Sequence, residues 1–253
     1  MHNTFTFAGV RSDALGLTIE KVPSMDRPAR KFDRYSVPGR NGDIFVMQDA
    51  WENVEMTYEV CWRGTPVETG LSLAAWLFGS SGYQTLTDTY DPNHFRKAVF
   101  VGPYDVENIL MRYGRATLTF DCDPRRFLTS GLTPISFTSE TPLFEVTNPT
   151  PFIAKPTIDI QIGPTDDDAE IYIGSQSAAY GATTLKLLAS SYSNHVVIYS
   201  EDEAACWGGT AVRVRWNGEV SGKFPLIFPG VNDVQIDPGY NGYGTIIPNW
   251  WTL

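Results

Sequence analysis

The chain has 253 residues and a formal net charge of −10, with 42% apolar and 19% charged residues. The apolar fraction excludes a disordered protein, and the acidic balance excludes a general nucleic-acid binder. With 13% aromatic residues, 22 glycines and 17 prolines, the composition favours strands and turns over helices, so we expect a mainly β fold.

The sequence predicts neither a cysteine-based site nor a membrane span. Cys61, Cys122 and Cys206 are far apart and contain no Cys-x-x-Cys pair, which argues against a disulfide framework or a zinc site. No stretch approaches the about 18 consecutive apolar residues of a membrane span, and the N-terminus has no signal-peptide pattern. We therefore expect a protein that is made and assembled in a cytoplasm and has no membrane partner.

Strands and one short helix are predicted in the N-terminal half. Apolar and polar residues alternate over Phe5–Val10, Leu15–Ile19 and Val54–Trp62, which indicates strands with one buried face. Leu71–Phe78 has helical spacing and is followed by Gly79, a helix-ending residue. Further strands are expected at Phe95–Val101 and at Ala116–Cys122, where Asp123-Pro124 ends the strand, and Tyr104–Arg112 is ambiguous.

The stretch from Pro28 to Val46 combines a turn with positive charge. Its centre, Val37–Gly42, contains Pro-Gly and Asn-Gly, which both form turns, and apolar residues stand on either side. The sequence therefore predicts a hairpin or an ordered loop between two strands. The basic residues in and before this stretch, Lys21, Arg27, Arg30, Lys31, Arg34 and Arg40, outnumber the acidic Asp26 and Asp33.

A proline-rich segment precedes a second set of strands. Thr129–Pro156 holds five prolines and is expected to be a linker between two domains, 1–135 and 136–253. Short strands at regular spacing with turn residues between them are typical of a β-sandwich. They are expected at Thr157–Ile162, Glu170–Ile173, Thr184–Leu188, Val196–Tyr199, Val212–Trp216, Pro225–Phe228, Asp233–Ile236 and Thr245–Ile247.

Six motifs follow one another along the chain. They are FAGV at 7–10, VPGRNG at 37–42, a Trp-Leu helix at 71–78, PRRF at 124–127, GKFPLIFPGVN at 222–232 and IIPNWWTL at 246–253. In this order they resemble the distal tail protein (Dit) family of long-tailed siphophages. The resemblance implies a β-rich, ring-forming N-terminal domain with one short helix and a C-terminal β-sandwich that is galectin-like or like a carbohydrate-binding module.

The same resemblance implies a structural role in a virion. Six copies would form a ring at the tail tip, a hub that joins the tail tube to the baseplate or tail tip during assembly in the host cytoplasm and during adsorption. The implied partners are other copies of the chain, tail tube or tail terminal proteins, a Tal-like tail-tip or tail-fibre protein, the tape measure protein and a receptor-binding protein. The family is structural, so we expect no enzymatic activity, no catalytic residues, no metal site and no cofactor.

The basic turn is the candidate oligomer interface. A ring needs a different patch on each side of every subunit, and extended segments often make such contacts. A projecting cationic turn would suit the acidic surface of a neighbouring copy; the alternative is an ordinary turn within its own subunit. The candidate interface residues are Arg34, Tyr35, Val37, Pro38, Gly39, Arg40, Asn41 and Gly42.

Other motifs have plainer interpretations. The acidic runs Asp166–Asp168 and Glu201–Glu203 lack the spacing of a calcium loop and are expected to be solvated turns. None of His2, His94 and His195 has the neighbouring groups that catalysis requires. Arg125-Arg126 is expected to bond local carboxylates such as Asp121 and Asp123, or else to form an intersubunit salt bridge.

Two functions from other classes remain open at this point. A carbohydrate-binding virion module could recognise host cell-wall saccharide through the C-terminal domain, with aromatic side chains as a stacking platform. A glycoside hydrolase would need paired carboxylates, which any acidic chain contains. The platform candidates, which could equally be core residues, are Trp207, Trp216, Tyr240, Tyr243, Trp250 and Trp251.

Overall fold

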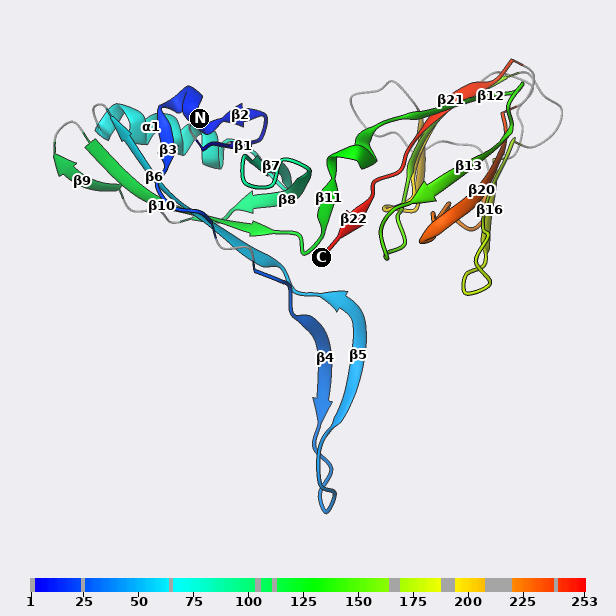
Figure 1. Ribbon diagram of the computed structural model, residues 1–253, viewed down its shortest axis with the longest axis horizontal. Coiled ribbons are helices and arrows are strands. Elements are labelled where there is room, and N and C mark those ends of the chain that lie inside the picture. The colour runs from blue at the N-terminus through cyan, green and yellow to red at the C-terminus, as the bar shows by residue number, and fades with distance from the viewer. Residues whose placement is uncertain are drawn as a thin grey trace. The chain divides into compact units, whose positions relative to one another are not determined.

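The computed structural model describes residues 3–23, 26–63, 66–102, 106–110, 113–163, 169–187, 194–207, 220–238 and 241–253. The chain divides into two compact units, Met1–Arg126 together with Leu253, and Phe127–Thr252. We call them the N-terminal unit and the C-terminal unit. Figure 1 shows that strands dominate both units and that α1 belongs to the N-terminal unit. The predicted fold class, mainly β with one short helix, is confirmed for the described residues.

The N-terminal unit is built on an antiparallel sheet in the order β2-β1-β7-β8-β10-β6-β3, and β9 pairs with the other end of β10. The strands are β1 (Phe5–Phe7), β2 (Val10–Arg11), β3 (Leu17–Ile19), β6 (Val54–Arg63), β7 (Gln84–Asp88), β8 (His94–Phe100), β9 (Val106–Leu110) and β10 (Tyr113–Cys122). A short 3-10 helix, η1 (Ser12–Leu15), connects β2 to β3. The segment that was ambiguous in the sequence, Tyr104–Arg112, thus contains β9.

One face of this sheet is covered by the helix. Every second residue of β6, from Val54 to Trp62, is buried, which is the alternation expected of a strand with one covered face. Helix α1 (Pro66–Phe78) places Leu73 and Leu77 in the same core. The helix begins five residues before the predicted start because proline is favoured in the first turn of a helix.

Strands β4 (Arg30–Tyr35) and β5 (Ile44–Trp51) form a two-stranded sheet of their own. The predicted turn joins them: the N–H of Arg40 donates to the carbonyl of Val37 at 3.2 Å. Gly39 and Gly42 both have a φ of +81°, which side chains with a Cβ rarely adopt. In Figure 1 this hairpin is a ribbon separate from the main sheet.

The C-terminal unit is a β-sandwich of two five-stranded sheets, as far as the described residues define it. One sheet has the order β12-β21-β14-β17-β18, with β12 (Ile135–Thr138), β14 (Thr157–Ile162), β17 (Asn194–Tyr199), β18 (Ala204–Trp207) and β21 (Tyr243–Ile247). The other has the order β13-β20-β15-β16-β19, with β13 (Leu143–Asn148), β15 (Ala169–Ser175), β16 (Ala182–Leu187), β19 (Val220–Gly222) and β20 (Gly230–Asp237). Isoleucines of both sheets, such as Ile160 and Ile171, meet in one core.

Two predictions about this half of the chain are wrong. Thr129–Pro156 is not a linker: it contains a 3-10 helix, η2 (Thr129–Leu132), and the strands β12 and β13. The expected domain boundary after residue 135 remains a prediction; the two compact units divide between Arg126 and Phe127. Pro225–Phe228 is not a strand, because prolines lack the N–H that a ladder needs; Ile227 forms only an isolated bridge with Ala154. The predicted strand Val212–Trp216 lies outside the described residues.

The end of the chain forms a strand that pairs with an earlier segment. Strand β11 (Arg126–Leu128) pairs with β22 (Trp251–Thr252), and the N–H of Leu128 donates to the carbonyl of Trp250 at 2.8 Å.

Within the described residues, no helix is long and apolar enough to cross a membrane.

Candidate functional site

The hairpin β4–β5 exposes large apolar side chains on one of its faces. The register places Phe32 opposite Met47 and Arg34 opposite Phe45, so these four side chains share a face. The rings of Phe32 and Phe45 are 5.3 Å apart, and the Arg34 guanidinium lies 5.8 Å from the centre of the Phe45 ring. About half of Phe32, Phe45 and Met47 is nevertheless exposed, at 48%, 51% and 56%.

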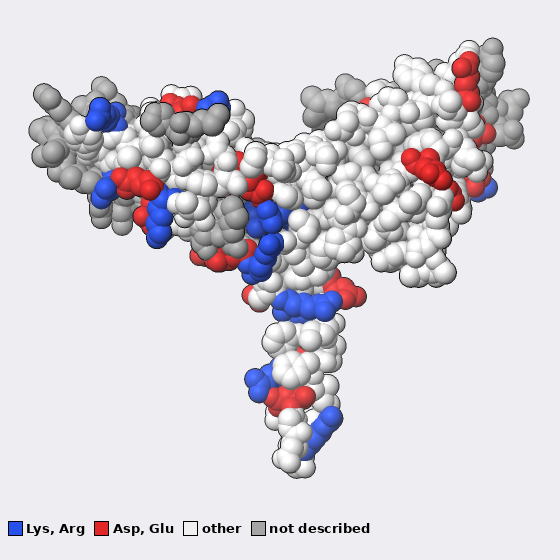
Figure 2. Space-filling model, viewed as in Figure 1, with Lys and Arg blue, Asp and Glu red and all other residues white. Residues whose placement is uncertain are grey.

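The opposite face of the hairpin is also apolar. Tyr35 pairs with Ile44, and Val46 pairs with Asp33; Tyr35, Ile44 and Val46 are all exposed. A two-stranded ribbon is only marginally stable alone, and contiguous exposed apolar surface on a protein usually marks an interaction site. Figure 2 shows the narrow arm formed by this hairpin as mostly uncharged surface with a few charged groups. This geometry is suited to contact with another protein on both faces.

The predicted interface residues lie together at the end of this arm. Arg34, Tyr35, Val37, Pro38, Gly39, Arg40, Asn41 and Gly42 are all exposed. Arg34 forms an ion pair with Asp43 of its own hairpin. The prediction did not include Phe45 and Met47, which belong to a continuous apolar run, Ile44–Met47, in β5.

The two arginines after Pro124 bond different carboxylates. Arg125 lies against Asp123, with Nε to Oδ1 at 2.9 Å and Nη2 to Oδ2 at 2.8 Å, as the local interpretation expected. Arg126 instead pairs with Asp91, which was not foreseen. Burial opposes ionisation of Asp123, but the hydrogen bonds from Arg125 outweigh it and hold the pKa of Asp123 below its usual value.

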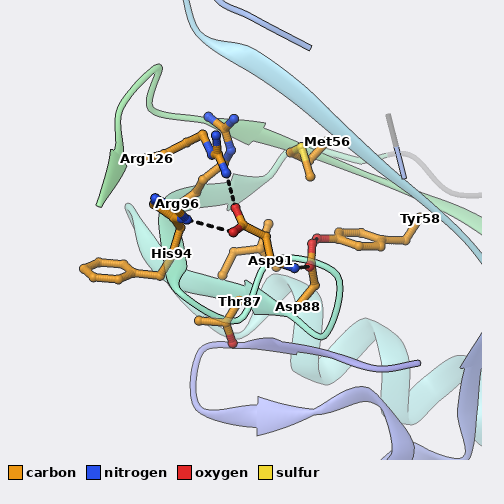
Figure 3. A pocket seen from close by; sticks show the side chains of 10 residues that line it. Met56, Tyr58, Thr87, Asp88, Asp91, His94, Arg96 and Arg126 are labelled. Atoms are coloured by element: carbon orange, nitrogen blue, oxygen red, sulfur yellow. Dashed lines mark hydrogen bonds and ion pairs between the residues drawn. The ribbon is translucent and has the colours of Figure 1, made fainter. Parts of the chain in front are cut away.

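A small polar pocket lies between β6, β7, β8 and β11 of the N-terminal unit (Figure 3). The Tyr58 hydroxyl donates to Asp88 Oδ2 at 2.8 Å, and His94 Nδ1 lies 2.7 Å from Asp91 Oδ1. Arg126 pairs with the other oxygen of Asp91. Burial opposes ionisation of Asp91, but these two hydrogen bonds outweigh it and lower the pKa of Asp91.

The carboxylates of Asp91 and Asp123 make the free energy of unfolding depend on pH in the acid range. Because the folded-state pKa values of Asp91 and Asp123 are lowered, both groups stabilise the fold above their unfolded pKa of about 3.9, and this contribution is lost as pH falls through the folded values. Replacing Asp91 by Asn removes the carboxylate partner of Arg126 and is expected to cost about 1–3 kcal/mol at neutral pH, because the pair is only partly buried. Urea unfolding between pH 7 and pH 3 measures both effects.

A matched control for this prediction is Asp49→Asn. Asp49 pairs with Arg30 at 3.7 Å, but its side chain is fully exposed, so its loss should hardly change the urea midpoint. A D91N protein as stable as the wild type at pH 7, with the same decline in acid, would contradict this account of the pocket.

Among the residues that the structure describes, the other candidates for chemistry do not assemble into a reactive site. His195 Nε2 lies 2.7 Å from Asp159 Oδ1, and His94 faces Asp91, but each of these pairs involves one histidine and one carboxylate. No group of three or more His, Cys, Asp and Glu side chains that could hold a metal occurs among the described residues. His2 and Asp166–Asp168 lie outside the described residues. In the second acidic run, Glu201–Glu203, the Oε2 atom of Glu201 lies 3.9 Å from Lys155 Nζ.

Of the aromatic residues proposed as a sugar platform, the structure describes the side chains of Tyr243, Trp250 and Trp251. Trp250 is buried in the core of the C-terminal unit, and Tyr243 is exposed. The Trp251 ring stacks on Phe152 at 4.3 Å, and its Nε1 donates to the carbonyl of Ile153. Trp216 and Tyr240 lie outside the described residues, as does the side chain of Trp207. Packing therefore accounts for Trp250 and Trp251.

Comparison of folds gives the clearest relationship. No family model and no curated protein matches the sequence. The crystal structure of the Dit protein (gp 19.1) of phage SPP1, described as a paradigm of the hub adsorption apparatus in phages infecting Gram-positive hosts, superimposes with a TM-score of 0.70. The match covers 100% of both chains at 12% sequence identity. The chain has the fold of a phage Dit protein.

Two further structures match the fold of this chain. Both are of the phage P2 baseplate in its activated conformation, one with Ca and one with Sr. They match with TM-scores of 0.54 and 0.56 at 7% and 9% identity, and cover 97% and 96% of this chain and 98% and 97% of theirs. The resemblance that the six motifs indicated thus agrees with the three-dimensional fold.

Proposed function

We propose that this chain is a structural protein of a phage tail tip, a distal tail hub that connects the tail tube to the baseplate or tip. The observation that carries this proposal is the match of the Dit fold over the whole length of the chain, including both units. The P2 baseplate matches support the same role. The function is assembly, which agrees with a surface rich in exposed apolar residues on one hairpin.

In this proposal six copies close into a ring through the N-terminal units. Each hairpin β4–β5 lies against the next subunit, with Arg34, Tyr35, Val37, Pro38, Gly39, Arg40, Asn41 and Gly42 at the contact. Such a contact is heterologous, since the hairpin of one copy meets a different surface of the next, and a closed ring is the outcome when the rotation closes. Burial of both apolar faces supplies the driving force.

The ring would sit at the tail tip of the virion after assembly in the host cytoplasm. Its neighbours would be the tail tube or tail terminal proteins, the tape measure protein, a Tal-like tail-tip or fibre protein and a receptor-binding protein.

The mass of the purified protein in solution tests the hub proposal. Mass photometry should find particles of six times the 28.1 kDa chain, and negative-stain images should show rings. A protein that stays monomeric at all accessible concentrations would contradict the ring.

A further inference from the structure

Helix α1 exposes a line of apolar side chains on the face that points away from the core. Leu73 and Leu77 belong to the buried core of the N-terminal unit. Leu71 and Phe78, by contrast, are 70% and 56% exposed, and Ala75 between them is also exposed. Residues spaced by three or four positions share a face of a helix, so these three side chains form one line along α1. A helix at a protein surface normally turns polar side chains to water, so this face indicates contact with another surface.

The C-terminal end of this line packs on the sheet. The Phe78 ring lies edge-on against Phe100 of β8, with the ring centres 5.2 Å apart. A Cβ added to Gly102 would lie 3.0 Å from Phe78 Cζ, so the ring also covers the chain just after β8. Val101, between these two residues, is 55% exposed and extends the apolar surface. We call Leu71, Ala75, Phe78 and Val101 the helix strip.

The helix beneath the strip is anchored to the main sheet. The Trp76 Nε1 donates to the carbonyl of Phe7 in β1 at 2.9 Å. Leu73 and Leu77 are almost completely buried in the same core. The helix strip is therefore a preformed surface, which binds a partner without the entropic cost of ordering a loop.

The hairpin β4–β5 has an apolar face of matching length. From Leu71 to Phe78 the strip extends about 10 Å, because a helix rises about 1.5 Å per residue. On the hairpin, Phe45 and Met47 are about 7 Å apart along β5, and Phe32 lies opposite Met47 on the same face. The two surfaces are thus of similar length, and the flexible methionine side chain adapts to an irregular apolar surface.

The charges of the two surfaces have opposite sign. The hairpin segment, 30–51, contains four basic and three acidic residues, although the whole chain has a net charge of −10. The two segments that contain the strip, 66–81 and 101–110, have no Lys or Arg and three acidic residues, Glu68, Asp105 and Glu107. Electrostatic attraction therefore favours an encounter between the hairpin of one copy and the strip of another.

We propose that the helix strip of one copy receives the hairpin of a second copy, through the face that carries Phe32, Phe45 and Met47. This proposal rests on the proposed ring and identifies the second patch of its heterologous contact. Hairpin and strip are different surfaces of one chain, so each copy offers its hairpin to one neighbour and its strip to the other. A closed ring requires this arrangement.

Glutamates in the strip are expected to abolish assembly without unfolding the chain. Leu71→Glu with Ala75→Glu changes two exposed positions of α1 to a good helix former, so circular dichroism should show the wild-type fold. Mass photometry should find hexamers of the wild type and only monomers of this variant. The control, Leu143→Glu with Thr147→Glu, places two charges on exposed positions of β13 and should retain hexamers. Hexamers of the L71E/A75E protein would overturn the proposal.

A mixture of two assembly-deficient variants tests the pairing of the surfaces directly. The F45E/M47E protein keeps its strip and loses its hairpin face, whereas the L71E/A75E protein keeps its hairpin face and loses its strip. Each variant alone should be monomeric. The mixture should contain a dimer of twice the 28.1 kDa chain, because one intact hairpin and one intact strip remain. Sedimentation velocity that finds only monomers in the mixture, at concentrations where the wild type assembles, would refute the pairing.

A cysteine pair separates this proposal from the ring itself. Met47→Cys with Ala75→Cys should give disulfide-linked oligomers after mild oxidation, whereas Met47→Cys with Thr147→Cys should not. Cross-links without hexamers would support the strip and contradict the hub proposal. Hexamers without cross-links would support the ring and overturn the strip, even if the glutamate variant of α1 does not fold.

Discussion

A protein with Phe45 and Met47 both replaced by glutamate is expected to remain a folded monomer and to lose the hexameric ring. The two residues lie on one face of the hairpin and are 51% and 56% exposed, so the monomer tolerates a charge there. In the proposed ring the same face is buried. Burying two unpaired carboxylates costs several kcal/mol each, because each charge loses its hydration. Mass photometry measures the loss of the ring, and circular dichroism measures the retained fold.

A matched control is Leu143→Glu, which places a charge on an apolar residue outside the hairpin that is at least as exposed as Phe45 and Met47. Leu143 is 66% exposed on strand β13 of the C-terminal unit, so this variant should still form rings. If the F45E/M47E protein formed hexamers like the wild type, the ring contact would have to lie elsewhere. Arg40→Glu should weaken the ring less, because the apolar faces would remain.

Replacing Trp250 by alanine is expected to destabilise the C-terminal unit by about 3–5 kcal/mol. The Trp250 side chain is 6% exposed and belongs to the core that both sheets of the sandwich share. Its backbone packs closely on Gly131, where an added Cβ would lie 2.5 Å from the Trp250 nitrogen. The surroundings therefore have little freedom to collapse into the space that the indole leaves. Urea unfolding followed by far-UV circular dichroism measures the change.

Tyr243→Ala is the control for the Trp250 variant. Tyr243 is an aromatic residue of the same final segment, but it is 59% exposed, so its loss should cost less than about 1 kcal/mol. Equal costs for the two variants would mean that Trp250 contributes through the segment as a whole rather than through its place in the core.

Local patterns predicted much of the fold because they reflect local physics. The alternation in Val54–Trp62 is that of strand β6, and the bounds of β14 agree with the predicted strand Thr157–Ile162. The proline count in Thr129–Pro156 misled because prolines there stand beside the strands and not inside them: Pro134 precedes β12 and Pro142 precedes β13. Proline is compatible with such positions, so its density alone does not identify a linker.

The polar pocket could not have been predicted from the sequence. Tyr58, Asp91, Arg96 and Arg126 come from separate segments, and only the pairing of the strands brings them together. Arg96 sits in a strand among Phe95, Lys97 and Ala98, where it looks like an ordinary surface residue. For the hairpin, the sequence predicted the turn but not its apolar faces. Which flanking residues share a face depends on the register of β4 and β5 across the turn.

The strand order of the C-terminal sandwich also constrains how the protein is made. Strand β21 lies between β12 and β14, so Ile246 pairs with both Ile135 and Ile158. On the ribosome, this sheet lacks a middle strand until residue 247 has emerged, long after its first two strands. By contrast, all strands of the order β2-β1-β7-β8-β10-β6-β3 in the N-terminal unit have been synthesised once residue 122 has been added. Chain topology therefore lets the strands of the N-terminal sheet pair before β21 is made, whereas the sheet that contains β21 cannot be completed until residue 247 is available, because distant strand pairs must wait for their partner.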